Sequence, residues 1–171
     1  MNPDLVRLAH TGANPDMLRR LVAESGWTGA VRRLRSSSKT SASVRASLDV
    51  AVETRLERLS AIGVVLVGED DDRFPASLAE LPDHPLWLFC RGHLDARPGV
   101  AVVGSRRATR YGVEIARSIG SRVAQAGWTV VSGLATGVDT AAHTGAVDAA
   151  GRTTAVLGSG IDVWYPRRNR V

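Results

Sequence analysis

Apolar side chains in the first third of the chain recur at the three- and four-residue spacing of helices. Residues 4–34 show this pattern, and the Asn14-Pro15 pair can end one helix and begin the next, because proline fits the first helical turn. Residues 35–43 are small and polar, which is typical of a linker or a loop. Beyond them, the apolar side chains lie four, four, four and three residues apart on one helical face: Val44, Leu48, Val52, Leu56 and Leu59. This part of the chain is therefore predicted to be helical.

Short apolar runs follow this helical part. Gly63 is expected to end the last helix, and residues 64–67 and 87–89 predict two strands. An acidic loop, a short helical turn and a proline-bounded exit separate the two runs. Residues 63–98 are therefore expected to connect the helical domain to the next one.

From residue 100 onward the pattern alternates between strands and helices. Three apolar, β-branched runs lack internal alternation, which indicates strands covered on both faces: residues 100–103, 129–131 and 153–157. Ile115, Ile119 and Val123 share one face of the helix between the first two runs, and an alanine-rich helix precedes the third. Helices between such strands imply right-handed crossovers and a parallel sheet. The fold class is predicted to be α/β, with an incomplete parallel sheet after a small helical domain.

Composition narrows the class of protein. The chain has 171 residues, enough for a small domain joined to a larger one. Its single cysteine, Cys90, excludes an internal disulfide framework, and the first thirty residues lack the charged and apolar regions of a signal peptide. No apolar run has the length of a bilayer span. We expect a soluble, cytoplasmic protein that does not associate with membranes.

The net charge of +5 lies in the second half of the chain. Residues 1–99 hold 13 Lys and Arg against 13 Asp and Glu, whereas residues 100–171 hold 9 against 4. Codon bias can account for arginine in place of lysine, since Lys39 is the only lysine, but it does not account for the uneven placement. All nine cations of the second part are arginines: Arg106, Arg107, Arg110, Arg117, Arg122, Arg152, Arg167, Arg168 and Arg170.

Glycine turns follow all three strands of the predicted parallel sheet. Gly104 follows the first strand, Gly133 the second and a Gly-Ser-Gly turn the third, so all lie at the carboxyl edge, where open α/β sheets bind ligands. Glycine lets a backbone approach an anion closely, and the following helix directs free N–H groups toward it. Arg106 and Arg107 beside the first turn strengthen the prediction of an anion site, with a solvated surface position as the alternative for each. The G-x-G-x-x-G spacing of dinucleotide enzymes is absent.

The sequence offers no catalytic constellation. Asp139 and His143 stand four residues apart on the alanine-rich helix, and a cap with a structural hydrogen bond is favoured over acid/base chemistry. Three serines lie in turns without the context of a catalytic triad: Ser105, Ser132 and Ser159. We therefore expect no catalytic residue, no metal site and no cofactor.

Three stretches carry a family resemblance: "RFPASLAELPDHPLWLFCRG", "VAVVGSRRATRYG" and "WTVVSGLATGVDTAAHTGAVDAAGRTTAVLGSGIDVWYP". In order and spacing they resemble the DNA-processing protein family DprA, also called Smf, between Phe74 and Pro166. The resemblance implies a SAM-like helical domain over residues 1–62 and a connecting segment over residues 63–98. It also implies that residues 99–171 are the first half of a Rossmann-like DNA-binding domain. Because family members continue beyond this point, we expect the chain to be a fragment.

The resemblance also implies a function. Proteins of this family bind single-stranded DNA in natural transformation, protect the incoming strand from nucleases and help to load RecA recombinase onto it. A binding protein without enzymatic activity is therefore expected, with single-stranded DNA and RecA as partners and a homodimer in the full-length protein.

Individual residues match family positions. Arg106 matches the DNA-contacting arginine of the Gly-Ser-Arg motif. Arg152 matches a second DNA-contacting basic position, although by geometry it precedes the third strand at the opposite edge. Four residues match loop positions that bring backbone amides to phosphates: Gly104, Ser105, Gly133 and Gly137. With Arg107 they form the expected DNA-binding set. Three aromatic residues are candidates for base stacking, with core packing as the alternative for each: Tyr111, Trp164 and Tyr165.

Two other classes of function compete with this interpretation. The first is a nucleotide-processing Rossmann enzyme resembling the LOG phosphoribohydrolases. Such enzymes carry a Pro-Gly-Gly-x-Gly-Thr-x-x-Glu motif with the catalytic glutamate, and this sequence lacks it. The second is a chain that only scaffolds and binds no ligand.

Overall fold

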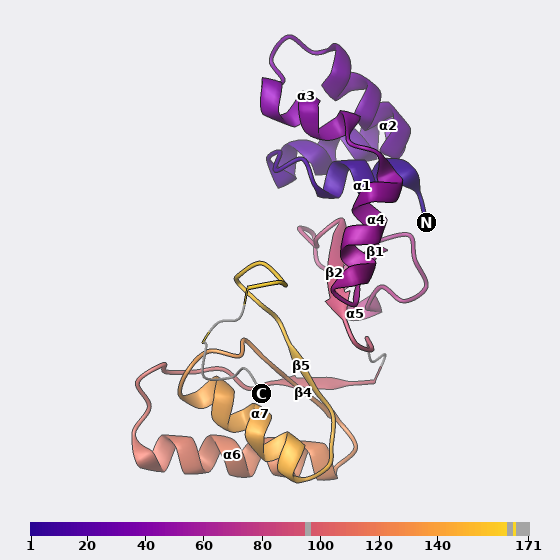
Figure 1. Cartoon of the computed structure of the whole chain (residues 1–171). Helices are drawn as coiled ribbons and strands as arrows, with labels where there is room; N and C mark the ends of the chain where they lie inside the picture. Colours follow the sequence, from indigo (N-terminus) through magenta and orange to yellow (C-terminus); the bar gives the residue numbers. More distant parts are fainter. Residues whose placement is uncertain (95–96, 164–165, 167–171) are drawn as a thin grey trace. The chain divides into compact units, whose positions relative to one another are not determined.

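The computed structural model describes residues 1–94, 97–163 and 166. The chain divides into two compact units, Met1–His93 and Leu94–Val171 (Figure 1). Within the described residues, no helix combines the length and the apolar character needed to cross a membrane. Each unit has its own cluster of buried apolar side chains, so each is described by itself.

The first unit begins with helices, as the sequence predicts. They are α1 (Pro3–Ala9), α2 (Pro15–Ser36), α3 (Ala42–Asp49) and α4 (Val52–Ala61). Asn14 caps α2, because its side chain accepts a hydrogen bond of 3.0 Å from the amide of Met17, and Pro15 is the first helical residue. Ser41 caps α3 in the same way through the amide of Val44, at 3.3 Å. The cap at Asn14 confirms the predicted boundary between the first two helices.

The helical face predicted over residues 44–59 is shared by two helices in the structure. Val50 and Ala51 are extended, with ψ angles of 130° and 137°, so α3 ends and α4 begins there. At the break, the buried guanidinium of Arg55 donates to the carbonyl oxygen of Ser47, which also accepts the amide of Val50 at the end of α3. Three members of the periodic set nevertheless remain buried: Leu48, Val52 and Leu59. The spacing therefore predicts the buried face and not the continuity of the backbone.

Residues 63–98 contain a β-hairpin that packs on the helices. β1 pairs antiparallel with β2, and the short α5 lies between them in the chain. Leu86 is 7% exposed and, with Trp87, packs on the apolar cluster of the helices. The hairpin belongs to the first unit, whereas the sequence predicts a connecting segment here. The bounds are Val64–Gly68 for β1, Ala76–Ala79 for α5 and Trp87–Arg91 for β2.

The described residues of the second unit form a parallel sheet with two helices, and this confirms the predicted α/β class. The strand order is β3-β4-β5, with Val100 beside Val130 and Val131 beside Thr154. In chain order the elements are β3 (Gly99–Ala101), α6 (Arg110–Gln125), β4 (Thr129–Ser132), α7 (Val138–Asp148) and β5 (Thr153–Ala155).

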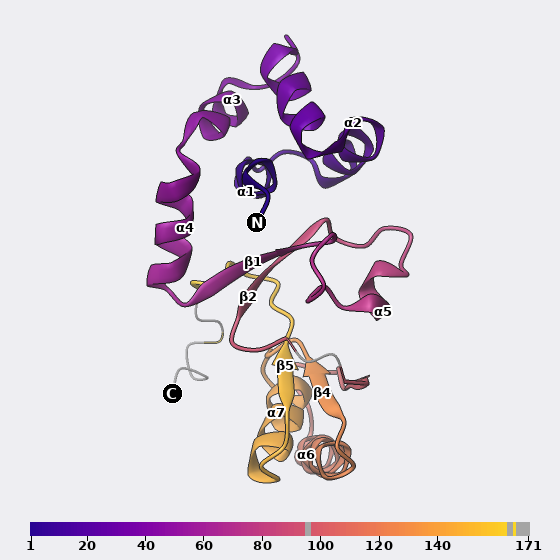
Figure 2. The same cartoon turned by 90° about the vertical axis from the view of Figure 1, so that its right-hand side faces the viewer.

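Both helices of the second unit lie on the same face of its sheet (Figures 1 and 2). Consecutive right-handed crossovers that step in one direction across a sheet produce this arrangement. The described residues of this unit thus cover one face of its sheet, whereas the sequence predicts strands covered on both faces. The buried cluster between sheet and helices consists of Val102, Ala124, Val130, Ala142 and Ala146.

The face by which α6 packs also differs from the prediction. Ile115 and Ile119 are 41% and 42% exposed, and α6 instead buries a neighbouring stripe of small residues: Ala116, Gly120 and Ala124. A Cβ atom on Gly120 would overlap the carbonyl oxygen of Ala142 in α7. The close approach of the two helix backbones, which only small side chains permit, therefore decides which face is buried.

Candidate nucleic-acid interface

The loops that follow the strands of the second unit meet at the carboxyl edge of its sheet. The parallel register pairs Ala101 with Val131 and Ser132 with Ala155, so the three strands end close together. Residues 102–109 lead from β3 to α6, and residues 133–137 lead from β4 to α7. The N-termini of both helices therefore follow these loops and contribute partial positive charge at this edge, as the sequence predicts.

Asp139 joins the first two loops. Its side chain is buried, with 6% of the residue exposed, in the first turn of α7. The amide of Gly104 donates to Oδ1 at 3.3 Å, and the amide of Gly133 donates to Oδ2 at 3.2 Å. The family resemblance implies that these two amides bind phosphates, but in this structure both donate to the carboxylate of Asp139. The sequence suggests only a helix cap for Asp139. The signal in the sequence for the joining role is the position of Asp139 just after a glycine loop, whose backbone amides need acceptors.

Gly137 brings the two loops into direct contact. Its φ angle of 86° lies in the left-handed region, and a Cβ atom there would overlap the carbonyl oxygen of Ser105. The amide of Val138 donates to the same oxygen at 3.2 Å, and the hydroxyl of Thr136 donates to the carbonyl oxygen of Arg106 at 3.0 Å. The two loops therefore form one continuous backbone surface, which we call the loop ledge (residues 104–107 and 133–137).

Arg106 and Arg107 are the cations of the loop ledge. Both are exposed, and within the described residues neither guanidinium has an intramolecular partner. Arg110, by contrast, pairs with Glu114 at 3.2 Å. The amide of Arg107 donates to the hydroxyl oxygen of Ser105 at 3.0 Å, which orders the turn that carries both arginines. The ledge thus presents two exposed positive charges that pair with no other described residue, an arrangement suited to phosphate groups.

The structure does not bring Arg152 to the loop ledge. Its carbonyl oxygen accepts a hydrogen bond of 3.0 Å from the amide of Val130, and the next residue, Thr153, begins β5. Arg152 therefore lies at the amino end of its strand, one strand length of about 10 Å from the carboxyl edge. The position inferred from strand geometry matches the structure, whereas the DNA contact implied by the family resemblance is not placed beside the other residues.

His143 has a structural partner rather than a catalytic one. It is 7% exposed, and its Nδ1 donates at 2.6 Å to the hydroxyl oxygen of Thr153, whose proton goes to the carbonyl oxygen of Val130 at 2.9 Å. Burial lowers the pKa of His143 below the usual 6.5. The buried imidazole thus links α7 to the sheet through Thr153, in keeping with a structural role for His143, whereas Asp139 does not cap α7 as the sequence suggests but binds the loop amides.

Tyr111 is an exposed aromatic residue of this region. It lies in the first turn of α6 and is 73% exposed, which rules out the core-packing alternative for this residue. The hydroxyl of Thr109 caps the same helix and accepts a hydrogen bond of 3.1 Å from the amide of Gly112. The other two candidates for base stacking, Trp164 and Tyr165, lie outside the described residues.

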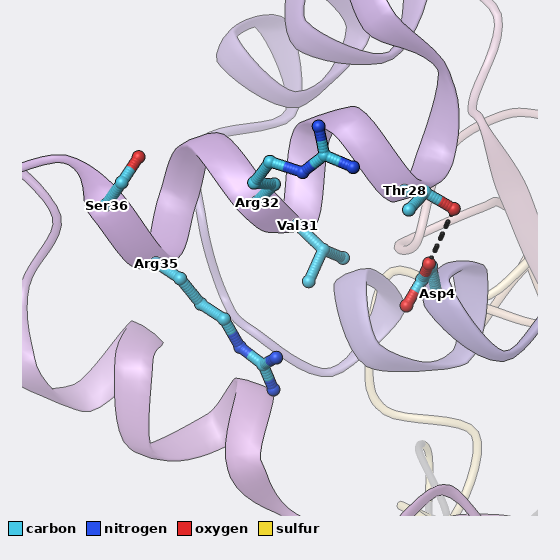
Figure 3. Close-up of a pocket in the computed structure, with 6 residues that line it drawn as sticks. All are labelled: Asp4, Thr28, Val31, Arg32, Arg35 and Ser36. Atoms are coloured by element: carbon cyan, nitrogen blue, oxygen red, sulfur yellow. Dashed lines mark hydrogen bonds between the residues drawn. The ribbon is translucent and has the colours of Figure 1, made fainter.

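A separate hollow lies in the first unit (Figure 3). It measures about 470 Å³ and lies between α1 and α2, with Arg32 and Arg35 projecting from α2. The hydroxyl of Thr28 donates to Asp4 at 2.8 Å across it. Arg35 donates to the carbonyl oxygen of Leu48 at 3.1 Å and serves packing between helices. No residue of the predicted DNA-binding set lines this hollow.

Comparison with known protein sequences yields one family. The family model of DNA recombination-mediator protein A matches residues 65–171. Protein Smf of Synechocystis is 43% identical over 107 residues, which cover 59% of this chain and 27% of that protein. DNA processing protein DprA of Streptococcus pneumoniae is 43% identical over 102 residues, covering 58% and 36%. Protein Smf of Escherichia coli is 34% identical over 168 residues, covering 97% and 43%. The chain thus spans less than half the length of these relatives.

Two solved structures are similar to this chain. The crystal structure of DprA from Streptococcus pneumoniae superimposes with a TM-score of 0.79 at 26% identity, covering 99% of this chain and 62% of that one. A structure from Helicobacter pylori, described as showing the single-stranded DNA binding mode of DNA processing protein A, has a TM-score of 0.52 at 28% identity. It covers 62% of this chain and 47% of that one.

Proposed function

This chain belongs to the DNA recombination-mediator protein A family, and from that premise we propose that it binds single-stranded DNA on the loop ledge. The observation that carries the proposal is the pair of exposed guanidinium groups of Arg106 and Arg107, which have no partner among the residues that the structure describes. They stand on a backbone surface that Asp139 and Gly137 hold in place. The similarity to the Helicobacter pylori structure, whose description names single-stranded DNA binding, supports the same ligand.

In the proposed complex, the arginines of the loop ledge bind the phosphates, and the other predicted residues of the ledge hold it in shape. Arg106 and Arg107 bind successive phosphates, because the guanidinium fork matches phosphate geometry. Ser105 and Gly137 shape the ledge through the turn and the close contact described above. Gly104 and Gly133 hold the loops on Asp139, so their proposed role is positioning rather than direct binding of phosphate. Arg152 lies at the amino edge of the sheet, so it contacts the DNA only where the bound DNA extends past the sheet.

In the cell, the proposed role is to coat and protect single strands during DNA uptake and to pass them to the RecA recombinase in the cytoplasm. The relatives named DNA processing protein and the family description of a recombination mediator support this role. A homodimer of the full-length protein is part of the same proposal, as is binding of DNA without its chemical conversion.

Fluorescence anisotropy of a labelled oligo-dT strand tests the proposal. The chain is titrated over a series of salt concentrations, together with the variants Arg106→Ala, Arg107→Ala and Arg122→Ala. Arg122 is the matched control, an exposed arginine in the last turn of α6. Each ledge variant is expected to flatten the slope of log affinity against log salt by about 0.7, the share of one phosphate contact, and the control is expected to leave it unchanged.

Competitors distinguish the alternatives in the same assay. Duplex DNA is expected to compete more weakly than the single strand, and AMP is expected not to compete. Absence of binding by a folded chain would refute the proposal. Displacement of the strand by AMP, with cleavage of the nucleotide, would instead identify a nucleotide-processing enzyme.

A further inference from the structure

Tyr111 places a large aromatic ring in solvent a few residues after the two exposed arginines of the loop ledge. It is 73% exposed and follows Arg107 by four residues, so the two Cα atoms lie within about 14 Å of each other. The buried cluster of this unit consists of valine and alanine side chains from the sheet, α6 and α7, and the described residues give Tyr111 no part in it. Single-strand binding proteins combine an exposed aromatic ring with a cationic surface that binds the phosphate backbone of the nucleic acid.

The start of α6 directs this ring toward the loop ledge. The Cα–Cβ bonds of a helix tilt toward its N-terminus, so a side chain in the first turn covers the segment that precedes the helix. The segment before α6 is the loop that carries Arg106 and Arg107. The cap at Thr109 fixes the first turn, since the amide of Gly112 donates to its hydroxyl at 3.1 Å. The backbone that carries Tyr111 is therefore ordered at the end of the segment that leads from the ledge into α6.

We propose that Tyr111 stacks on an unpaired base of the strand whose phosphates lie on Arg106 and Arg107. This inference rests on the proposed function and adds the group that separates a single strand from a duplex. A base in a single strand turns out of its stack at low cost and lies flat on an aromatic ring, whereas a duplex base is paired and stacked on both faces. Because every base has a π face, the contact selects strandedness and not sequence.

Other apolar residues on the same face of α6 could instead serve a protein partner, and the experiment has to distinguish such a partner from a base. Tyr111, Ile115 and Ile119 lie at four-residue intervals along α6 and are all exposed. A protein partner on this stripe would use the apolar character of residue 111, while a base needs an aromatic ring. Tyr111→Leu keeps the former and removes the latter, and Tyr111→Phe keeps both but removes the hydroxyl.

The experiment compares three strands of equal length: oligo-dT, the same strand with abasic sites, and a duplex. The full chain is titrated with each, alongside Tyr111→Leu, Tyr111→Phe and the control Trp128→Leu. Trp128 is 47% exposed and directly precedes β4. Its substitution therefore removes an exposed aromatic residue at the opposite edge of the same sheet. Circular dichroism confirms that each variant is folded.

Stacking predicts that Tyr111→Leu weakens binding of oligo-dT by about 5- to 100-fold without altering the salt slope, because no phosphate contact is lost. Binding of the abasic strand and of the duplex should be unchanged by this substitution. Tyr111→Phe and Trp128→Leu should bind oligo-dT as the unmodified chain does. The unmodified chain should prefer oligo-dT to the abasic strand, a result that does not depend on the folding of any variant.

Three results would overturn the inference. Equal affinity of Tyr111→Leu and the unmodified chain for oligo-dT would show that the ring makes no contact. An equal loss on the abasic strand would show that its contact is not with a base. If the unmodified chain binds no single strand at all, the proposed function fails as well, which distinguishes that failure from the failure of stacking alone.

Discussion

Substitution of Asp139 is the most direct test of how the loop ledge is held together. The carboxylate is buried and accepts the amides of Gly104 and Gly133 at 3.3 and 3.2 Å. Asp139→Ala removes both hydrogen bonds and leaves two glycine amides without their acceptor. Asp139→Asn keeps one oxygen and turns an NH₂ group toward the second amide, so it removes one bond.

The magnitude follows from the two contacts. A hydrogen bond to a charged acceptor contributes about 1.5–3 kcal/mol, and both bonds here exceed the usual N–H···O length of about 2.9 Å, which places each at the low end. Removal of the carboxylate also removes the cost of burying it, which offsets part of the loss. We expect Asp139→Ala to lower the free energy of unfolding by about 2 kcal/mol and Asp139→Asn by about 1 kcal/mol.

Urea unfolding and hydrogen–deuterium exchange measure the effect. With about 1–2 kcal/mol per M urea for a unit of this size, the alanine variant should unfold at a midpoint lower by about 1–2 M. Exchange should accelerate in peptides that contain Gly104 and Gly133. The control is Asp148→Ala in the same helix, whose exposed carboxylate pairs with Arg117 and should contribute less than about 1 kcal/mol. An unchanged midpoint and unchanged exchange in Asp139→Ala would refute the joining role of this residue.

Two further predictions concern the second unit. Gly120→Ala should destabilise it by about 1–3 kcal/mol, because the added methyl group overlaps the carbonyl oxygen of Ala142, and a thermal melt beside the exposed control Ser118→Ala measures this; equal melting temperatures would contradict it. Burial lowers the pKa of His143 from 6.5, so the unfolded chain binds the proton first and the contribution of this residue to stability is lost as the pH falls below 6.5. Urea midpoints between about pH 7.5 and 5 should therefore fall less in His143→Gln than in the unmodified chain, and an equal fall would count against this role.

Local signals in the sequence predict most of the secondary structure. The cap at Asn14 and the β-branched runs of the second unit act over a few residues, so residue type and spacing are enough to find them. The break at Val50 and Ala51 is different, since it accompanies a contact between Arg55 and the end of the preceding helix. The periodic pattern on both sides of the break is the same as in a continuous helix.

The buried face of α6 shows the limit of hydrophobic spacing. Ile115 and Ile119 have the stronger apolar character, but the adjacent stripe with Gly120 meets α7 because small residues allow the backbones to approach. The hairpin over residues 64–91 is a second case in which local spacing does not show where an element packs. Its two strands are predicted, but their attachment to the helices depends on Leu86, whose contacts lie far away along the chain.

The amino-acid sequence by itself determined the α/β class, the glycine turns at the carboxyl edge and the arginines beside the first turn, because each depends on neighbouring residues or on strand direction. Only the tertiary structure decided that Asp139 takes the amides of Gly104 and Gly133, that Arg152 lies at the other edge, and that Tyr111 is exposed. These facts depend on strand register and helix packing, which bring together residues from different elements, such as Gly104 and Asp139, which lie 35 positions apart in the chain. Spacing along one segment does not determine which of these residues meet.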